Sequence, residues 1–157
     1  MKPKVYLETT IPSYLTARPS RDLICAGRQQ LTRQWWDSRR GEFDLYVSPA
    51  VLDEVSAGDP SAAAERLRVL ENLPILDLTA EATGLAAALL RSVPLSAKSS
   101  IDALHIAIAA VGGMDYLLTW NCRHLANATL RHTIATIITD SGFEPALICT
   151  PDELLGG

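Results

Sequence analysis

Three acids and one amide from separate parts of this sequence stand beside apolar segments: Glu8, Glu54, Asp102 and Asn121. Acids directed at the edge of a protein core repel one another unless protons or a cation neutralise them. Carboxylate, amide and water oxygens suit Mg²⁺ or Mn²⁺, and the sequence has no thiolate pair or paired histidines that would favour zinc. If the fold brings these four residues together, they predict a magnesium site, with manganese as the alternative ion.

Asp102 is the single acid of an apolar, alanine-rich segment, residues 101–111. Helical rotation places it beside an expected buried arc, which consists of Ile101, Leu104 and Ile108. A carboxylate at the border of the core needs a partner, either a metal ion or a local ion pair with Lys98 one turn earlier. His105 lies one turn later on the same side, and we interpret it as a histidine with satisfied hydrogen bonds or a support for a ligand.

Glu54 belongs to a segment that Ser48 and Pro49 predict to be helical, since serine is a favoured N-cap and proline a favoured first residue. Helical rotation puts Glu54 at the border of the buried arc and Asp53 on the far side. That arc consists of Val51, Leu52 and Val55. A lone glutamate in such a position is more often a solvated helix acid, because helices commonly carry surface glutamates.

Glu8 and Asn121 each follow an apolar run that is expected to be a strand. In open α/β sheets, ligands gather outside the carboxyl ends of the strands, so both residues are expected to face the site. Each also has a plain structural interpretation, Glu8 as a strand-end acid and Asn121 as a helix cap. The joint placement of all four polar residues is what favours a metal site.

Strands and helices alternate along the chain. Apolar runs predict strands at residues 5–7, 43–47, 75–78, 115–119 and 146–149. Helical spacing and capping residues predict a helix that opens near Pro12, helices at 22–40, 49–56, 60–72, 80–91 and 101–111, and helical segments through Asp140. Thr79 is the expected cap of the fifth helix, Ser99 or Ser100 that of the sixth, and residues 150–153 form a capping box.

This alternation predicts an α/β protein with a mostly parallel sheet covered by helices, because parallel strands need crossover helices to return the chain. No internal linker or repeat is visible, and the length of 157 residues fits one domain with its own core. The hydrophobic fraction of 48% is typical of a packed globular chain.

Composition excludes several classes of protein. The formal net charge of −4 provides no overall positive field, so any binding of nucleic acid must be local. The three cysteines are far apart, which argues against a disulfide framework and predicts reduced, mostly buried thiols. No apolar run approaches the ~20 residues of a membrane span and no secretory signal is visible, so we expect a cytoplasmic protein.

Trp35 and Trp36 lie close in sequence to Arg33, Arg39 and Arg40. Such a group can stack on bases and bind phosphates. A buried helix face with solvated arginines explains the same residues, and it is the interpretation that we prefer.

Three blocks of the sequence together resemble the PIN-domain family, and in particular its VapC-type ribonuclease toxins: YLETTIPSYL, VSPAVLDEVSAGD and IDALHIAIAAVGGMDYLLTWNCRHLAN. The resemblance implies a three-layer α/β/α, Rossmann-like fold that forms a single PIN-like domain over residues 1–157. It also implies that the family's metal-binding acids correspond to Glu8, Glu54 and Asp102, with Asn121 at the fourth position. The family usually has aspartate at the first and fourth positions, so Glu8 and Asn121 depart from its pattern.

The resemblance further implies a Mg²⁺-dependent endoribonuclease that cleaves single-stranded RNA, acting as the toxin of a type II toxin–antitoxin pair. The partners that it implies are single-stranded RNA and a cognate antitoxin protein, and a homodimer is left open. The implied chemistry is in-line attack of a water on phosphorus at the metal site.

The two departures support an alternative, a PIN-like module that has lost catalysis and serves in RNA binding or regulation. Against this alternative, a glutamate still reaches a metal from a slightly more distant backbone, and an amide oxygen is an acceptable, uncharged Mg²⁺ ligand. A receiver-like phosphotransfer domain shares the parallel sheet but requires a phosphorylatable aspartate after a strand, which Glu8 does not provide.

Overall fold

A sheet of four parallel strands lies at the centre of the computed structural model, in the order β2-β1-β3-β4. The strands are β1 (Lys4–Leu7), β2 (Asp44–Tyr46), β3 (Tyr116–Leu118) and β4 (Leu147–Cys149). The structure describes residues 1–92 and 100–156. Because every pairing is parallel, the carboxyl ends of all four strands lie at one edge of the sheet. The predicted α/β class with a mostly parallel sheet is confirmed.

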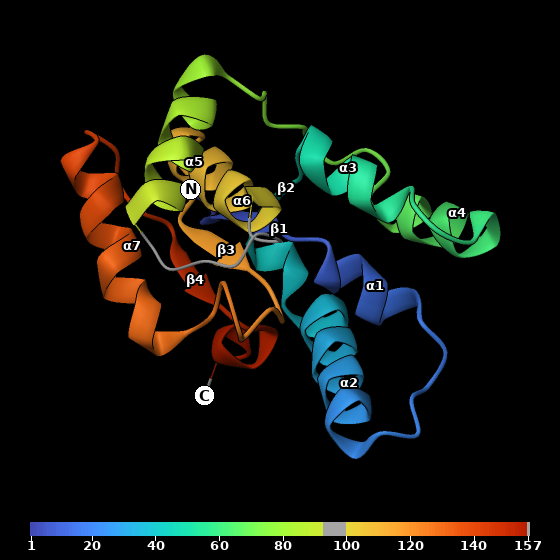
Figure 1. Cartoon of the computed structure of the whole chain (residues 1–157). Coiled ribbons are helices and arrows are strands. Elements are labelled where there is room, and N and C mark those ends of the chain that lie inside the picture. Colours follow the sequence, from blue (N-terminus) through green and yellow to red (C-terminus); the bar gives the residue numbers. More distant parts are fainter. Residues whose placement is uncertain (93–99, 157) are drawn as a thin grey trace.

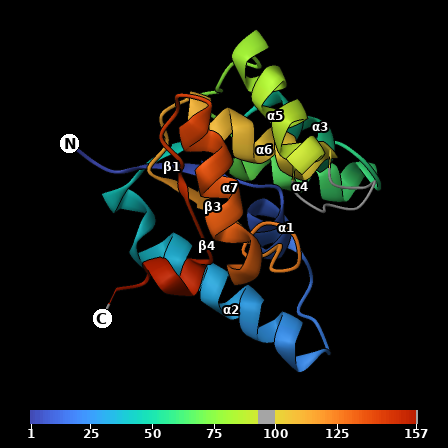
Figure 2. The ribbon, with the colours of Figure 1, turned by 60° about the vertical axis from the view of Figure 1, so that its left-hand side comes forward.

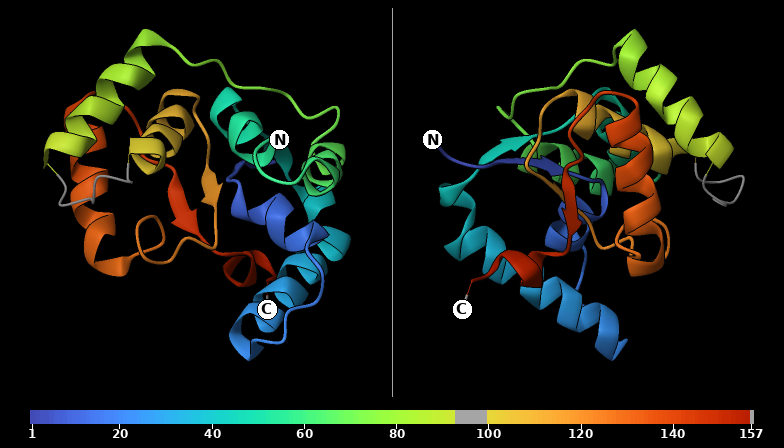
Figure 3. Two further views of the ribbon diagram at one scale, coloured as in Figure 1. Left: turned by 45° about the vertical axis from the view of Figure 1, so that its right-hand side comes forward. Right: turned by 90° about the vertical axis from the view of Figure 1, so that its left-hand side faces the viewer.

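Helices cover both faces of this sheet. They are α1 (Thr10–Thr16), α2 (Leu23–Ser38), α3 (Pro49–Val55), α4 (Pro60–Val69), α5 (Ala80–Ser92), α6 (Ser100–Val111) and α7 (Ala128–Asp140). Helices α5, α6 and α7 lie together on one side, and α1 and α2 lie on the other (Figures 1 and 3). Helix α5 packs against α6 and α7, while α1 packs against α2 and α4. The three-layer α/β/α arrangement is therefore confirmed.

Two short 3-10 helices complete the described part of the chain, η1 (Arg40–Glu42) and η3 (Pro151–Leu154). The second follows β4 and lies against α2 (Figure 2). It begins with the predicted capping box, in which Thr150 and Glu153 satisfy each other's backbone N–H groups. The last strand thus pairs with β3, and the last turn packs on α2, an element from the first third of the sequence.

The core lies between the sheet and its helices. Residues 5–7 of β1 are fully buried, as expected of a central parallel strand that is covered on both faces. Trp35 of α2 is also fully buried and lies beside Phe43, with ring centroids 5.8 Å apart. Trp36 is half-buried, and the Arg40 guanidinium lies 4.5 Å from its ring centroid. The preferred interpretation of a buried helix face holds for Trp35.

Capping residues set where the helices begin, largely as predicted. Ser48 accepts a hydrogen bond from Val51 N at 3.3 Å, and Pro49 is the first residue of α3. Thr79 caps α5 through Ala82 N at 3.1 Å. Since Ser100 is already part of α6, the predicted capping role of Ser100 is wrong, and the alternative cap, Ser99, lies outside the described residues.

The strand predicted at residues 75–78 is wrong, because only an isolated bridge forms there, between Val47 and Ile75. Strand β2 ends at Tyr46, and the chain turns at Ser48 into α3, so only Val47 is left to pair with the incoming segment. Ile75 is 54% exposed, as suits a residue beyond the sheet edge.

Several helix boundaries also differ from those predicted. Helix α1 begins at Thr10 and not near Pro12. Helix α2 uses Asp22 as its cap and ends at Ser38, and its first two apolar residues, Leu23 and Ile24, are 87% and 70% exposed. Those two side chains precede the first contact of α2 with the core, so their helical spacing does not imply burial.

Two predictions about composition are settled by the structure. All three cysteines are free, but only Cys149 is buried, whereas Cys25 and Cys122 are half-buried. The expectation of mostly buried thiols is therefore wrong. Of the helices in the described ranges, none has the length and apolar character needed to cross a bilayer.

Candidate metal centre

The candidate site lies at the carboxyl edge of the sheet. Glu8 directly follows β1, and Asn121 follows β3 after two residues. Helix α3, which carries Glu54, starts two residues after β2. Helix α6 leads back into β3, so its first turns, with Asp102 and His105, lie near the same edge. Parallel pairing of β2, β1 and β3 thus supplies the site from three neighbouring strands.

Glu8 is a buried carboxylate, only 4% exposed. Its Oε1 atom accepts three hydrogen bonds, from Thr10 N at 3.1 Å, Thr10 Oγ1 at 2.5 Å and Thr119 Oγ1 at 2.7 Å. Burial raises the pKa of Glu8 above its ordinary value, although the nearby His105 and these hydrogen bonds oppose the increase. The charged form of this side chain is therefore costly unless a further cation approaches it.

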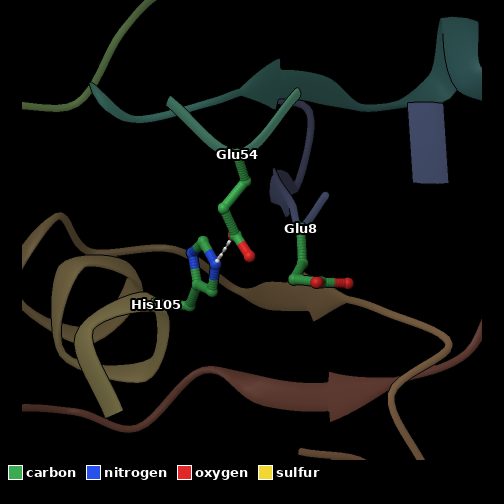
Figure 4. Close-up of side chains that lie close together, drawn as sticks. All are labelled: Glu8, Glu54 and His105. Carbon is green, nitrogen blue, oxygen red and sulfur yellow. Dashed lines mark hydrogen bonds and ion pairs between the residues drawn. The ribbon is translucent and has the colours of Figure 1, made fainter. Parts of the chain in front are cut away.

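Glu54 projects from α3 toward His105 and Glu8 (Figure 4). Its Oε1 atom accepts from Thr9 Oγ1 at 2.7 Å and lies 2.6 Å from His105 Nε2. Partial burial acts to raise the pKa of Glu54, but the hydrogen bonds from His105 and Thr9 and the charge of His105 outweigh it and lower the pKa. The ligand atoms of Glu8, Glu54 and His105 all lie within 4.8 Å of one another.

His105 is fully buried, and both of its ring nitrogens have partners. Nε2 meets Glu54, and Nδ1 lies 2.6 Å from the Tyr6 hydroxyl, which in turn lies 2.7 Å from Ser48 Oγ. The interpretation of His105 as a histidine with satisfied hydrogen bonds is confirmed.

Asp102 is half-buried and accepts a hydrogen bond from Asn121 Nδ2 at 3.2 Å. Burial raises its pKa, the charge of Glu54 adds to the increase, and His124, His105 and the Asn121 hydrogen bond oppose it. Asp102 is thus coupled electrostatically to the cluster of Glu8, Glu54 and His105 without belonging to it. The alternative partner of Asp102, Lys98, lies outside the described residues.

The burial predicted around Asp102 needs correction. Ile101 is 39% exposed and Leu104 is half-buried, whereas Ile108 is buried with its neighbours from residue 105 to residue 110. Helix α6 is packed between α5 and β3, so its second half is enclosed on nearly all sides. A single apolar arc therefore describes it poorly.

The plain structural interpretation of Asn121 was a helix cap, but Asn121 does not cap any of the helices that the structure describes. Its Oδ1 atom accepts from His124 N at 3.1 Å within a turn, and the cap of α7 is Asn127, which accepts from Thr129 N at 3.0 Å. Because the amide oxygen of Asn121 is used in the turn, its NH₂ group faces Asp102. Asn121 therefore stabilises a neighbouring acid.

The sequence did not reveal the hydroxyl groups that hold the acids in place. Tyr6 lies in the apolar run that predicts the first strand, and Thr10 and Thr119 lie near the ends of predicted strands. The one available signal was the pair of threonines directly after Glu8, since hydroxyls next to a buried acid are its natural donors. The structure thus brings Glu8 and Glu54 together, pairs Asp102 with Asn121, and adds Tyr6 to the site.

The donor set fits a hard divalent cation. The hydrogen bonds that Glu8 and Glu54 receive from the described residues all go to one oxygen of each carboxylate, Oε1. An ionised carboxylate accepts through both oxygens, so the second oxygen of each side chain is suited to a ligand. Carboxylate oxygens in this arrangement are donors of the kind that a hard divalent cation prefers. Convergence of all four residues on one ion stays a prediction.

Comparison with known proteins agrees with this geometry. A family model described as PIN domain matches residues 5–128, a range that includes all four candidate site residues. Among curated proteins, no significant sequence match was found.

Two solved structures share the fold. VapC20 of Mycobacterium tuberculosis, a sarcin-ricin loop cleaving toxin, has 16% identity and a TM-score of 0.59, over 88% of this chain and 95% of that one. A chain of VapBC2 from Rickettsia felis, in a complex with a DNA fragment from its promoter, has 16% identity and a TM-score of 0.59, over 94% of this chain and 98% of that one. Since the family model spans the sheet from β1 to β3 together with the acidic edge, this chain belongs to the PIN-domain family.

Proposed function

We propose that this protein is a Mg²⁺-dependent endoribonuclease that cleaves single-stranded RNA, as the toxin of a VapC-type toxin–antitoxin pair. The observation that carries the proposal is the approach of the Glu8 and Glu54 carboxylates, whose ligand atoms lie within 4.8 Å of each other at the carboxyl edge of the sheet. Membership of the PIN-domain family and the fold shared with a sarcin-ricin loop cleaving toxin support it.

In this proposal Glu8, Glu54 and Asp102 hold the metal ion, and Mn²⁺ can replace Mg²⁺. The bound ion supplies Lewis acidity and an activated water for attack on a phosphodiester. Thr10 and Thr119 orient Glu8 through hydrogen bonds of 2.5 and 2.7 Å, and these bonds oppose the increase in its pKa that burial causes. Asn121, whose amide oxygen accepts from His124 N, contributes chiefly by donating to Asp102.

Arg28 is a local cation suited to hold the RNA backbone. Its guanidinium lies 5.4 Å from the ring centroid of Trp120, and its pKa is raised, chiefly by a hydrogen bond with Tyr14. Trp120 N donates to Thr10 Oγ1, which in turn donates to Glu8. Arg28 thus contacts the residue whose backbone N–H is linked through Thr10 to Glu8, in a chain whose net charge is −4, where phosphate binding needs local bases.

We also propose a protein partner, a cellular location and a domain organisation for this chain. A cognate antitoxin protein is the expected inhibitor, and the VapBC2 complex is the structural precedent for such a pair. We place the protein in the cytoplasm, where its RNA substrate would be. Residues 1–157 are proposed to form one domain, because β4 pairs with β3 and η3 lies against α2.

The test is cleavage of single-stranded RNA across a Mg²⁺ titration, with Asp102→Ala as the inactive control. The double variant Glu8→Asp with Asn121→Asp restores the family's usual acids and is expected to cleave faster than the natural protein at low Mg²⁺. The added carboxylate strengthens attraction for the ion, and excess metal should narrow the difference.

A second function is favoured by the engagement of the Asn121 amide oxygen with His124 N, which weakens the fourth ligand position. A PIN-like RNA-binding or regulatory module predicts cleavage only in the double variant, or in neither protein. If the natural protein, the double variant and Asp102→Ala cannot be distinguished at any Mg²⁺ concentration, the nuclease function is excluded.

A further inference from the structure

We propose that Tyr6 and His105 act as a positioning pair that fixes the Glu54 carboxylate for metal binding, and that His105 is not itself a metal ligand. This inference rests on the proposed metal site and deepens it. It assigns roles to two buried side chains that come from different elements, Tyr6 from β1 and His105 from α6.

The contacts form a continuous chain of hydrogen bonds from the start of α3 to the acid near its end. Ser48 Oγ lies 2.7 Å from the Tyr6 hydroxyl, which lies 2.6 Å from His105 Nδ1, and His105 Nε2 lies 2.6 Å from Glu54 Oε1. Ser48, Tyr6 and His105 are fully buried, whereas Glu54 is half-buried. These hydrogen bonds therefore link the core to the Glu54 carboxylate, which faces Glu8 (Figure 4).

The hydrogen-bond donors and acceptors around the ring define the role of His105. Glu54 Oε1 is an acceptor that already receives the Thr9 hydroxyl at 2.7 Å, so His105 Nε2 must carry a hydrogen to approach it at 2.6 Å. A protonated ring nitrogen has no lone pair to give to a metal ion. On the other side of the ring, Nδ1 accepts from Tyr6 and the Tyr6 oxygen accepts from Ser48, so one direction of donation satisfies every group.

The hydrogen bond from His105 helps to orient the Glu54 carboxylate. A glutamate side chain has several rotatable bonds, and holding it in one conformation costs conformational entropy. Glu54 lies in the last turn of the short helix α3, next to Val55 at its end. Hydrogen bonds from His105 and Thr9 to a single oxygen leave the other oxygen in a defined direction. In known metal sites, mutation of a residue that hydrogen-bonds to a metal ligand weakens metal affinity by roughly 10- to 100-fold.

The first test measures Mn²⁺ affinity by calorimetry in the full-length protein. His105→Leu removes the donor to Glu54 and is expected to weaken binding on the order of 10- to 100-fold. His105→Gln places an amide N–H near the original Nε2 position and should restore much of the affinity. Tyr6→Phe, which preserves the ring and removes only the hydroxyl, should weaken binding on the order of several-fold.

Matched controls separate positioning from general damage. His132→Gln changes an exposed histidine of α7, and Tyr116→Phe removes a hydroxyl from β3, so both should bind Mn²⁺ like the natural protein. Natural affinity in both His105→Leu and Tyr6→Phe would overturn the inference. If His105→Leu does not fold, Tyr6→Phe alone decides the result.

The second test distinguishes a supporting histidine from a ligand. The chain has three histidines, so ¹⁵N-resolved NMR can follow the His105 ring, identified by the signals missing in His105→Gln. We expect Nε2 to be protonated without metal and to stay protonated when Mg²⁺ is added. Loss of that proton on Mg²⁺ addition would make His105 a ligand and overturn the inference. Natural protein that binds neither Mg²⁺ nor Mn²⁺ would instead exclude the proposed metal site.

Discussion

At the scale of single residues, the site contains acids whose burial makes their charged forms unfavourable. Glu8 is buried and its pKa is raised. Asp102 is half-buried with a raised pKa, while hydrogen bonds hold the pKa of Glu54 low. A cation at this point would relieve the cost for Glu8 and Asp102 together. Both acids are therefore expected to destabilise the metal-free protein and to stabilise the metal-bound form.

Glu8→Gln should stabilise the metal-free protein in a pH-dependent way. Because the folded-state pKa of Glu8 is raised, the natural protein loses stability as pH rises from the unfolded value, about 4.3, through the folded value. Glutamine keeps an oxygen for Thr10 and Thr119 and carries no charge. The stability gap between variant and natural protein should therefore be smallest at acid pH and largest above the folded-state pKa.

Chemical denaturation in chelator at a series of pH values measures that gap. Glu65→Gln, at an exposed position of α4, is the matched control and should show no comparable change with pH. A gap that is constant over the whole range would show that burial does not penalise the charge of Glu8.

Asp102→Asn should raise the melting temperature in chelator and reduce the further increase that Mg²⁺ produces. Removing the charge relieves repulsion with Glu54 and the free-energy cost of burial, and the same change removes a proposed metal ligand. Mg²⁺ at a concentration of 100 times its Kd would stabilise the folded protein by about 2.7 kcal/mol. Melting curves with and without Mg²⁺ check this, and an unchanged Mg²⁺ effect in the variant would exclude Asp102 as a ligand.

At the scale of elements, the start of α3 decides where Glu54 points. Ser48 caps the helix and Pro49 opens it, and a shift of one residue would rotate Glu54 by about 100° away from His105. The same Ser48 hydroxyl is hydrogen-bonded to Tyr6 at 2.7 Å. One side chain thus fixes both the register of the helix and the support of its acid.

Ser48→Ala should therefore cost stability and also weaken Mn²⁺ binding. Loss of an N-cap costs about 1 kcal/mol, and Tyr6 loses a hydrogen-bond partner. Asp59 caps α4 through Ala62 N at 2.9 Å and is exposed. Asp59→Ala should cost a similar amount of unfolding free energy and leave Mn²⁺ affinity unchanged. Denaturation and calorimetry on both variants test this, and equal Mn²⁺ affinity in the two would show that Ser48 is only a cap.

At the scale of the whole molecule, the net charge of −4 means that the proposed RNA binding would depend on local cations. Helix α2 brings Arg28 to Trp120, which follows β3 at the edge of the sheet where Glu8 and Asn121 also follow their strands. The acids suit a metal ion and the guanidinium suits a phosphate. We therefore expect mutation to separate the proposed metal binding from the proposed phosphate binding.

Arg28→Gln should weaken binding of single-stranded RNA and leave Mn²⁺ affinity unchanged. Loss of one phosphate contact reduces the slope of log affinity against log salt by about 0.7 for single strands. Arg28→Lys keeps the charge and should keep most of that slope. Fluorescence anisotropy over a salt series, in the Asp102→Ala background to prevent cleavage, provides the measurement. An unchanged slope in Arg28→Gln would place the phosphate contacts elsewhere.

The sequence alone determined the class of fold and the edge where the polar residues gather. Alternating apolar runs and caps such as Ser48 specify local structure, and parallel strands joined by helices must place their carboxyl ends together. Glu8, Glu54 and Asp102 could therefore be assigned to one edge before any contact was known. Local signals failed at residues 75–78, where the end of β2 left only one residue to pair with.

Only the tertiary structure decided which groups touch. It placed Glu8 and Glu54 beside His105, joined Asp102 to Asn121, and turned Tyr6 from a core residue into a hydrogen-bond partner. Each of these contacts joins side chains from different elements, at distances where a fraction of an ångström separates a hydrogen bond from none. Periodicity fixes the face on which a residue lies, but the packing of α3, α6 and β1 against one another fixes its partner.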